Sequence, residues 1–337
     1  MDKIDFVIPW VDGNDPHWRE DKNYHWKKNN TNAFIDGNNE SRFRDWGNLR
    51  YWFRGVEKFT PWVNNIYFVT YGHVPEWLNV DHPKIKVIKH EDYIPKKYLP
   101  VFQANPIEIN FHRIPGLSEK FVYFNDDMFV INHMTERDFF VEDRPREMAV
   151  LYPITNTENN DSFSHMLLSM TGLINSSFSK KQCIKNNFFK WFSPCYGKSL
   201  LNNILMYRYN NISGLLATHV PSSLKKSTME EVWRCYEERL WEVTSHKFRD
   251  PSDITQYIFR YWTIMKGDFE PTNIYKYSKE FFLQDGSEEE LLDAIMNKKY
   301  KMICINDTET ISNFEKTRDR IIEAFDSILG DKSEFEL

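Results

Sequence analysis

Two adjacent aspartates, Asp126 and Asp127, lie within the apolar run "FVYFNDDMFV" (121–130). Neighbouring carboxylates repel each other, and a charge among apolar side chains is costly unless a partner offsets it. Carboxylate oxygens are the ligands that hard cations such as Mg²⁺ and Mn²⁺ prefer, so a metal site is one interpretation. The other is a turn in which Asn125 and the aspartates accept hydrogen bonds from nearby amides. These residues alone leave both open.

A further acidic residue could join this group. In "PIEINFHRI" (106–114), Glu108 and His112 are four residues apart, so on a helix they share one face. If that face looks onto the end of the strand, Glu108 becomes a third metal ligand beside Asp126 and Asp127. The simpler alternative is a hydrogen-bonded pair local to the helix.

Two basic side chains in the second half suit phosphate chemistry. His219 lies in "ATHVPSS", a turn constrained by proline, and Arg249 in "SHKFRDPSD", just before a helix that Pro251 could begin. Histidine can move a proton near neutral pH, and the guanidinium fork matches a phosphate. The ordinary alternatives are a surface histidine and an arginine paired with a nearby acid.

The loop "VDGNDP" (11–16) is a candidate for nucleotide binding. Asp12 and Gly13 follow the first predicted strand, and a glycine there lets backbone amides approach a ligand closely. An ordinary β-turn is the alternative. Further candidates for phosphate or ribose contacts are Arg42, Arg44 and Asn48.

The elements that must position these residues alternate in the first half. We expect strands at 3–10, 65–72, 85–90 and 120–124, and helices at 47–59 and at 106–114, the second opened by Pro106. This alternation predicts an α/β fold with a mostly parallel sheet and helices on its faces. Ligands of such sheets bind beyond the carboxyl ends of the strands, where the aspartates and the 11–16 loop fall.

The pattern turns helical after about residue 155. Capping boxes predict helices at 228–247, 288–298 and 313–329, the last ended by Gly330. The three boxes are Ser227 with Glu230, Ser287 with Glu290, and Ser312 with Glu315. We therefore expect an α/β nucleotide-sugar-binding half (1–155) and a mainly helical half (156–337) that together form one catalytic unit with the site between them.

The composition of the chain limits the classes of binding partner and the cellular locations that we expect. The chain has 337 residues and a net charge of −6, and its basic residues are dispersed, which argues against duplex nucleic acid. No apolar run approaches the roughly 18 residues of a membrane span, and the N-terminus lacks the order of a secretion signal. We expect a soluble cytoplasmic protein with reduced thiols, which a partner could recruit to the inner face of the membrane.

Four segments resemble the conserved regions of the Stealth family of sugar-1-phosphate transferases. They are "DFVIPWVDGNDPHW", the long stretch from "FRDWGNLRYWF" to "FVYFNDDMFV", the stretch from "THVPSSL" to "SHKFRDPSDITQYIFRYW", and "KMICINDTE". They occur in the family's order over residues 5 to 309. The family includes bacterial capsular polysaccharide phosphotransferases and the animal enzyme that marks lysosomal glycoproteins with N-acetylglucosamine-1-phosphate.

The resemblance implies a GT-A-like fold and a divalent ion, Mg²⁺ or Mn²⁺. It also implies transfer of hexose-1-phosphate from a nucleotide sugar, often UDP-N-acetylglucosamine, to a hydroxyl of an oligosaccharide or polysaccharide, with release of a nucleoside monophosphate. The family's functional positions fall on Glu108, Asp127, His219 and Arg249. A bacterial capsule enzyme, working with membrane-associated capsule machinery, fits this chain better than a lumenal animal enzyme.

The chain departs from the family pattern at two positions. Ser222 stands where many members have a second histidine, which removes any proton or phosphate role there, and Pro9 stands where "TWV" is common. Two rival functions share the fold or its ligands: a metal-dependent glycosyltransferase that releases a nucleoside diphosphate, and a sugar-binding protein without catalysis. The joint presence of four functional positions argues against the second.

Overall fold

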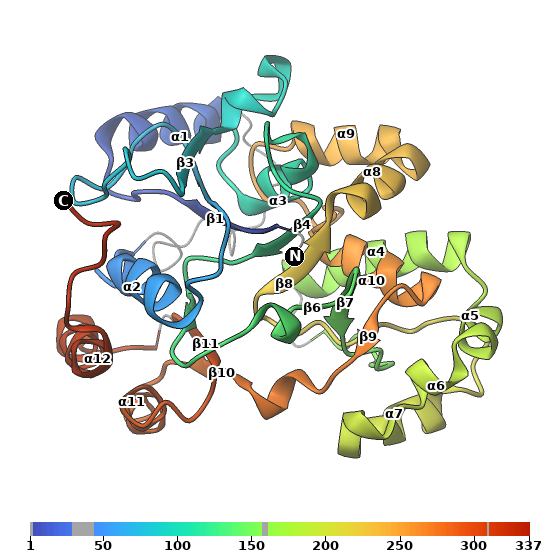
Figure 1. The fold of residues 1–337 in the computed structure, drawn as a ribbon. Helices are drawn as coiled ribbons and strands as arrows, with labels where there is room; N and C mark the ends of the chain where they lie inside the picture. Colours follow the sequence, from blue (N-terminus) through green and yellow to red (C-terminus); the bar gives the residue numbers. More distant parts are fainter. Residues whose placement is uncertain (1–2, 29–43, 157–160, 309) are drawn as a thin grey trace.

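The computed structural model describes residues 3–28, 44–156, 161–308 and 310–337 (Figure 1). The strands are β1 (Ile4–Trp10), β2 (Ile66–Thr70), β3 (Ile85–Lys89), β4 (Lys120–Tyr123), β5 (Met128–Val130), β6 (Phe140–Val141), β7 (Arg144–Glu147), β8 (Ser222–Lys225), β9 (Glu270–Pro271), β10 (Ser278–Phe282) and β11 (Met302–Asn306). The helices of the first half are α1 (Pro16–Lys28), α2 (Leu49–Phe59) and α3 (Ala104–Glu108). Those of the second half are α4 (Ser162–Ser177), α5 (Lys180–Asn186), α6 (Phe188–Trp191), α7 (Leu200–Met206), α8 (Lys226–Cys235), α9 (Glu237–Ser245), α10 (Tyr257–Lys266), α11 (Glu288–Met296) and α12 (Phe314–Leu329).

The central sheet has the order β3-β2-β1-β4-β8, with the first four strands parallel and β8 antiparallel. Successive side chains of these strands point to opposite faces, so Phe6 and Phe68 join one core while Val7 and Val69 join the other. β2 is buried along its whole length, as expected for an inner strand of a parallel sheet, whereas the edge strand β3 exposes Lys86 and Lys89. The predicted α/β class, a mostly parallel sheet flanked by helices, is confirmed.

The run "FVYFNDDMFV" is two strands and not one. β4 ends at Tyr123 in the central sheet, and the chain turns through residues 124–127 into β5, which belongs to a second sheet with the order β10-β11-β5. In that sheet β5 lies antiparallel to β11, with Met128 opposite Cys304. Asn125, Asp126 and Asp127 therefore lie in the turn where the chain passes from one sheet to the other.

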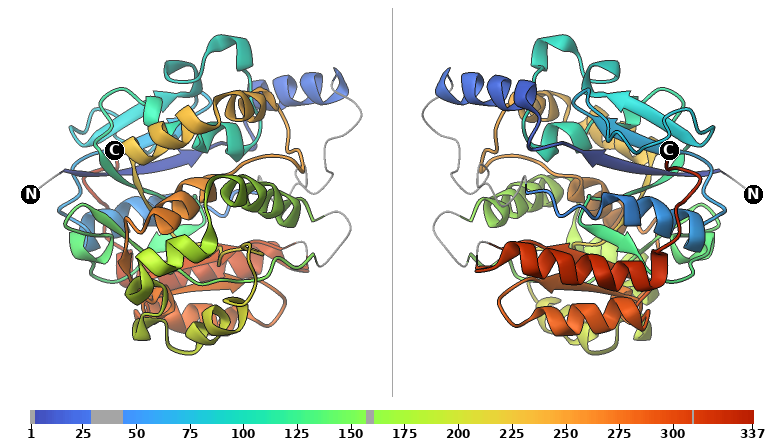
Figure 2. Two further views of the ribbon diagram at one scale, coloured as in Figure 1. Left: turned by 90° about the vertical axis from the view of Figure 1, so that its right-hand side faces the viewer. Right: turned by 90° about the vertical axis from the view of Figure 1, so that its left-hand side faces the viewer.

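Helix α2 packs between the two sheets. Its residue Gly55 lies so close to β5 that a Cβ there would approach the carbonyl oxygen of Val130 to 2.4 Å. α11 and α12 lie side by side in both views of Figure 2 and, with α2, share a core with β5 and β11. A third, small sheet has the order β6-β7-β9.

The second half contributes strands as well as helices, which the sequence did not predict. β8 completes the central sheet, and β10 and β11 form most of the second sheet. The predicted helix at 228–247 is broken into α8 and α9 at Tyr236. No helix in the described ranges is long and apolar enough to cross a bilayer.

None of the three predicted capping boxes forms, although Ser287 does stand at the predicted N-cap position. Ser227 lies inside α8 and donates its hydroxyl hydrogen to Glu119. The N-cap of α12 is Asn313, whose side chain accepts from the Lys316 amide, and not Ser312. Ser287 is the N-cap residue of α11, but its hydroxyl bonds to Gln284 and makes no capping bond. Gly330 follows α12 as expected, with right-handed backbone angles.

Candidate active site

The candidate site lies at the carboxyl edge of the parallel strands. β1, β2 and β3 extend the sheet in one direction and β4 lies on the other side of β1, so the strand order reverses between β1 and β4. Ligands of α/β sheets bind beyond the carboxyl ends of the strands at such a reversal. The loop after β1 and the Asn125–Asp127 turn after β4 both start at that point.

Asp127 and His219 are in contact at this edge. His219 Nε2 lies 3.0 Å from Asp127 Oδ2 and 3.5 Å from Asn125 Nδ2. β8 runs antiparallel to β4 with Ser222 opposite Tyr123, so the residues just before β8 lie beside the turn just after β4. The pairing of these two strands therefore brings together side chains that are 92 positions apart in the sequence.

A buried ion pair holds the backbone of the turn that carries His219. Arg260 Nε lies 2.7 Å from Glu147 Oε1, and the same guanidinium donates to the carbonyl oxygen of Thr218 at 3.2 Å. The Tyr257 hydroxyl donates to that carbonyl at 3.0 Å. Since a buried charge is tolerated only when it is paired and hydrogen-bonded, this arrangement restricts the position of the turn.

Electrostatics keep a proton on His219. Burial lowers its pKa, but the charges of Asp127 and Glu280 outweigh burial and raise the pKa to about 9. Glu280, on β10, also accepts from the His219 backbone amide at 2.6 Å. In this arrangement the imidazole carries a positive charge at neutral pH.

Glu108 contacts the aspartate turn through the hydroxyl group of Tyr123. The Tyr123 hydroxyl donates to Glu108 Oε1 at 2.6 Å and lies against Asn125 Oδ1. Burial raises the pKa of Glu108, although the Tyr123 hydrogen bond and the positive charges of Arg249 and His219 act in the opposite direction. Glu108 is therefore near both basic residues of the site.

Glu108 and His112 do not share a helical face, so that prediction was wrong. α3 begins two residues before Pro106 and ends at Glu108, and Phe111–Arg113 form a separate 3₁₀ turn. The Asn110 side chain donates to the Pro106 carbonyl oxygen at 2.8 Å, which offers that carbonyl an alternative to a continued helix. His112 packs against Trp233, at a ring distance of 5.3 Å, away from the aspartates.

Three side chains of the described residues come close enough to hold one metal ion. The ligand atoms of Asp127, His219 and Cys304 all lie within 4.8 Å of one another, and neither Asp126 nor Glu108 belongs to that group. Burial and the charge of Asp127 hold the pKa of the Cys304 thiol well above its usual range, so the thiol stays protonated. Asp127 Oδ1 is buried and has no hydrogen-bond partner in the described chain, so it is the oxygen best suited to a hard cation.

Asp126 differs from its neighbour in exposure. Its side chain is accessible to solvent, yet protein atoms surround it on most sides. This partial loss of hydration, together with the charge of Asp127, raises its pKa to about 7. A carboxyl group with such a pKa can exchange a proton near neutral pH.

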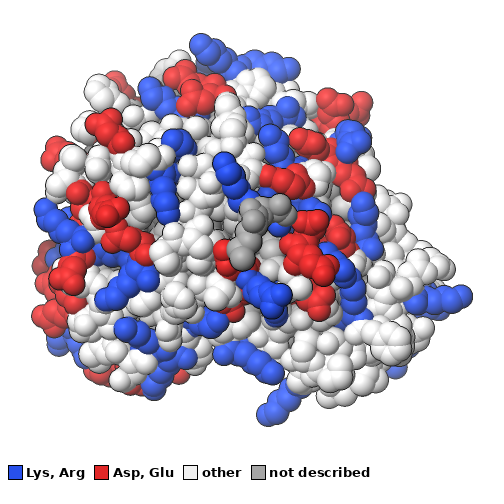
Figure 3. All heavy atoms as spheres, viewed as in Figure 1, with Lys and Arg blue, Asp and Glu red and all other residues white. Residues whose placement is uncertain are grey.

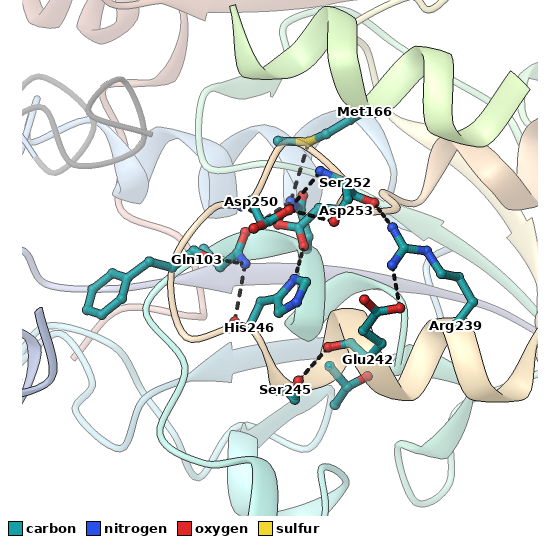
Figure 4. A network of polar contacts seen from close by, with 12 residues as sticks. Gln103, Met166, Arg239, Glu242, Ser245, His246, Asp250, Ser252 and Asp253 are labelled. Atoms are coloured by element: carbon teal, nitrogen blue, oxygen red, sulfur yellow. Dashed lines mark hydrogen bonds and ion pairs between the residues drawn. The ribbon is translucent and has the colours of Figure 1, made fainter. Parts of the chain in front are cut away.

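Arg249 lies in a loop that the buried carboxylate of Asp253 holds through residues before and after the arginine (Figure 4). Asp253, fully buried, accepts from the Asp250 amide at 3.0 Å and from Asn105 Nδ2 at 2.9 Å, and it lies 2.6 Å from His246 Nδ1. The predicted alternative, an Arg249 ion pair with Asp250 or Asp253, does not occur.

The backbone of this loop is also held, whereas the Arg249 guanidinium has no partner among the described residues. Gln103 Nε2 donates to the carbonyl oxygens of His246 and Phe248 at 3.2 and 2.8 Å. Arg249 itself is half-buried, and no hydrogen bond or ion pair joins its guanidinium to another residue of the described ranges. An ordered loop with an unpaired arginine suits an anionic ligand.

The loop after β1 forms a local turn that leads into a helix. The Asp12 side chain accepts from the Asn14 amide at 2.8 Å, and the Asp12 amide donates to His73 at 2.8 Å. Asp15 accepts from the Trp18 amide at 2.7 Å and so caps α1, which the sequence analysis missed. The Gly13 carbonyl oxygen accepts from Arg19. The signal was present as an aspartate before a proline at the first helical position.

The remaining nucleotide-side candidates make contacts within the protein. Arg44 lies 3.6 Å from Asp307 and stacks over Phe314 at 4.7 Å. Asn48 precedes α2, and its carbonyl oxygen accepts from the Tyr51 amide at 2.9 Å. Arg42 lies outside the described residues. Arg44 therefore has partners within the protein, and the ligand contacts of Arg44 and Asn48 stay predictions.

Tyr123, Glu280 and Cys304 belong to the site but were not predicted. Tyr123 and Cys304 occur in runs that read only as apolar strands, and Glu280 lies in a short segment without a recognisable pattern. Their role depends on which strands pair. The pairing of β10 with β11 places Glu280 beside Cys304, and no local feature of the sequence reports that pairing.

Family models match three parts of the chain. Stealth protein conserved region 1 matches residues 2–24, conserved region 2 matches residues 42–148, and conserved region 3 matches residues 218–261. These ranges contain Asp127, Glu108, His219 and Arg249.

Curated bacterial proteins are similar to the chain along its whole length. The capsular polysaccharide phosphotransferase WcwK of Streptococcus pneumoniae is 41% identical over 337 residues, which cover 100% of this chain and 98% of that protein. The receptor polysaccharide phosphotransferase WefC of Streptococcus gordonii is 42% identical over 340 residues, covering 100% of both. The exopolysaccharide phosphotransferase cps2G of Lactiplantibacillus plantarum is 37% identical and covers 99% of this chain and 96% of its own.

Solved structures with a similar course of the chain include glycosyltransferases. A galactosyltransferase, LgtC, in complex with donor and acceptor sugar analogs is 10% identical, with a TM-score of 0.43 and 98% of each chain covered. The bifunctional glycosyltransferase WbbM is 11% identical, with a TM-score of 0.36 and coverage of 97% of this chain and 52% of its own.

Proposed function

Since this chain belongs to the Stealth family and is a phosphotransferase of capsule synthesis, we propose that it transfers hexose-1-phosphate from a nucleotide sugar to a hydroxyl group of a saccharide acceptor. The acceptor oxygen attacks the phosphorus atom that carries the sugar, and the bond from this phosphorus to the nucleoside monophosphate breaks. The products are a phosphodiester-linked saccharide and a nucleoside monophosphate. The anomeric carbon keeps its bond to oxygen throughout.

The observation that carries this proposal is that the Asp127–His219 pair and Arg249 both lie near Glu108, and that the Arg249 guanidinium has no partner within the described parts of the chain. Transfer of a phosphoryl group depends on positioning and on neutralising charge at the phosphate oxygens. Two cationic side chains near one buried carboxylate are suited to that task. A protein that only binds a neutral sugar has no use for them.

Asp127 is the residue that would hold a divalent cation. Its Oδ1 atom is buried and receives no hydrogen bond from the residues that the structure describes, which leaves this carboxylate oxygen available to a hard ion. Mg²⁺ or Mn²⁺ bound there would offset the negative charge of the diphosphate. Glu108 is a positioning residue for the same turn, because the Tyr123 hydroxyl bonds to both Glu108 and Asn125.

His219 and Arg249 contact the transferred phosphate. His219 Nε2 lies 3.0 Å from Asp127 Oδ2, so its imidazole stands beside the proposed cation site, where the phosphate would bind. Arg249 adds a charge-assisted, two-pronged hydrogen bond. Asp126 accepts the proton of the acceptor hydroxyl, because its carboxyl group is accessible to solvent and lies next to the proposed cation site.

The experiment that tests the reaction identifies the nucleotide that leaves. Purified protein is incubated with Mg²⁺, a capsule-derived oligosaccharide and a panel of nucleotide sugars, and the released nucleotide is separated by chromatography. We expect nucleoside monophosphate, formed only when acceptor is present. Loss of Arg249, as Arg249→Ala, should reduce the rate by about 10³-fold.

Variants of the two aspartates separate their roles. Asp127→Asn should abolish Mg²⁺-dependent turnover, whereas Asp126→Asn should lower it by about 10²-fold. Asp331→Asn, at an exposed position beyond α12, is the matched control and should leave the rate unchanged. Release of nucleoside diphosphate would instead establish a glycosyltransferase, and donor binding without turnover would establish a binding protein.

A further inference from the structure

Helices α5, α6 and α7 lie together at one end of the molecule and carry apolar side chains on their outer surface (Figure 1). Phe189, on α6, is 87% exposed, and Leu205, on α7, is 59% exposed. Leu201 and Ile204 are exposed on the same side of α7, because residues three and four apart share a helical face.

Contacts between aromatic rings connect α6 to the residue that follows α7. Phe188 contacts Phe189 at a ring distance of 5.8 Å and Phe192 at 4.7 Å. Phe192 contacts Tyr207, at the end of α7, at 6.1 Å. Exposed large apolar groups that occur singly need no explanation, but a contiguous group of them marks an interaction surface. We call this surface the α6–α7 face.

The chain segment that forms the α6–α7 face carries charge of one sign, and the acids near it, Asp268 and Glu270 beside Lys190, come from another segment. No Asp or Glu occurs between Asp161 and Glu230, although the chain as a whole has a net charge of −6. The exposed cations of this segment are Lys181, Lys185, Lys198 and Arg208. In Figure 3 the lower right of the molecule, over these helices, is white and blue without red.

We propose that the α6–α7 face docks on the surface of an anionic lipid bilayer. Aromatic and aliphatic side chains would enter the boundary between headgroups and acyl chains, while the surrounding lysines would contact the negatively charged headgroups. Protein interfaces are depleted in lysine, so the composition favours a membrane over a protein partner. This inference rests on the surface alone and holds whatever the donor and acceptor are.

Binding to vesicles tests the proposal without any substrate. The purified full-length protein is sedimented with vesicles of phosphatidylcholine alone and with vesicles of phosphatidylcholine and phosphatidylglycerol in equal amounts. We expect strong binding only to the second kind. Raising the ionic strength from about 0.1 M to about 1 M should weaken it, since the screening length falls from about 10 Å to about 3 Å.

Two double variants separate the charged and apolar parts of the surface. Lys181→Gln with Lys185→Gln should reduce binding about 25-fold, because each lysine near an anionic surface contributes about fivefold. Phe189→Ser with Leu205→Ser should reduce it at least roughly tenfold through lost apolar burial.

Matched controls lie on the opposite side of the fold. Met296, 50% exposed at the end of α11, and Lys316, exposed on α12, supply Met296→Ser and Lys316→Gln. Both should bind as the unaltered protein does. Circular dichroism of every variant verifies that it is folded.

Two results would overturn the proposal. The first is sedimentation with anionic vesicles that is absent, or that is unaffected by both double variants. The second is a concentration-dependent dimer, detected by light scattering, that the Phe189 and Leu205 substitutions convert to monomer, because the face would then bind a second copy of the chain.

Discussion

Asp253→Asn should lower the activity of the protein much more than its stability. Asp253 is fully buried and accepts hydrogen bonds from Asn105 Nδ2 at 2.9 Å and the Asp250 amide at 3.0 Å, while its other oxygen pairs with His246 at 2.6 Å. An asparagine keeps the shape and one carbonyl oxygen for the first two donors. Only the interaction with His246 loses its ionic character, which costs about 1–2 kcal/mol.

The expected effect on activity follows from the position of this group. Asp253 and His246 hold the loop on either side of Arg249. The Arg249 guanidinium itself has no hydrogen bond or ion pair to any residue of the described ranges. A displacement of about 1 Å in a group that orients the substrate can cost about 100-fold in rate. We therefore expect kcat to fall about 10- to 100-fold in Asp253→Asn, with the urea midpoint little changed.

A double-variant cycle decides whether the effect passes through Arg249. If it does, Asp253→Asn should cause no further loss when Arg249 is already alanine, because there is no guanidinium left to position. The assay is release of nucleoside monophosphate, with urea unfolding as the stability measurement and Asp331→Asn as the control. An equal loss from Asp253→Asn in both backgrounds would refute the reasoning. Asp253→Ala, which removes all three interactions, should also destabilise the fold by about 3–5 kcal/mol.

Two further predictions concern stability. Gly55→Ala should destabilise the protein by about 3 kcal/mol, because its Cβ would lie 2.4 Å from the Val130 carbonyl oxygen. Gly172→Ala, whose Cβ would meet nothing within 4 Å, should stabilise the protein by about 0.5–1 kcal/mol. Urea unfolding measures both free energies, and equal effects would contradict the close packing of α2. Burial lowers the pKa of His90 from 6.5 to about 4 and that of His112 from 6.5 to about 3. Below pH 6.5 the unfolded chain therefore binds protons that the folded chain does not, so the free energy of unfolding falls as the pH falls toward those values. The loss is about 1.4 kcal/mol per pH unit for each histidine. His112→Gln should reduce this slope between pH 6.5 and 4.5, and an unchanged slope would show that other groups control acid unfolding.

The parallel sheet was predictable because its strands are apolar runs bounded by Gly, Pro or Asn, a local property of the sequence. β1, β2, β3 and β4 therefore occur where expected, and so does the carboxyl edge that carries Asp126 and Asp127. Strand pairing is not local. An apolar alternation across residues 121–130 cannot show that β4 and β5 belong to different sheets, or that β11 is the partner of β5.

The errors at helices have similarly identifiable causes. Capping by Ser227 failed because Glu119, far away in the sequence, binds its hydroxyl group. The helix at 106–114 ended early because the Asn110 side chain binds the Pro106 carbonyl. The contact of His219 with Asp127 depends on β8 pairing with β4, so spacing could not predict it. Only the family resemblance connected the two residues beforehand.

The change of sheet at residues 124–127 has a consequence for synthesis of the chain on the ribosome. β4 remains an open edge until β8 (Ser222–Lys225) is made, and β5 has no strand partner until β11 (Met302–Asn306) is made. At roughly 5–20 residues per second, the wait between β5 and β11 is on the order of ten to thirty seconds. During that time the apolar strand beside the unfinished site packs against α2 but has no strand partner at its edge. The nascent protein must therefore be shielded from aggregation longest at the very segment that its activity requires.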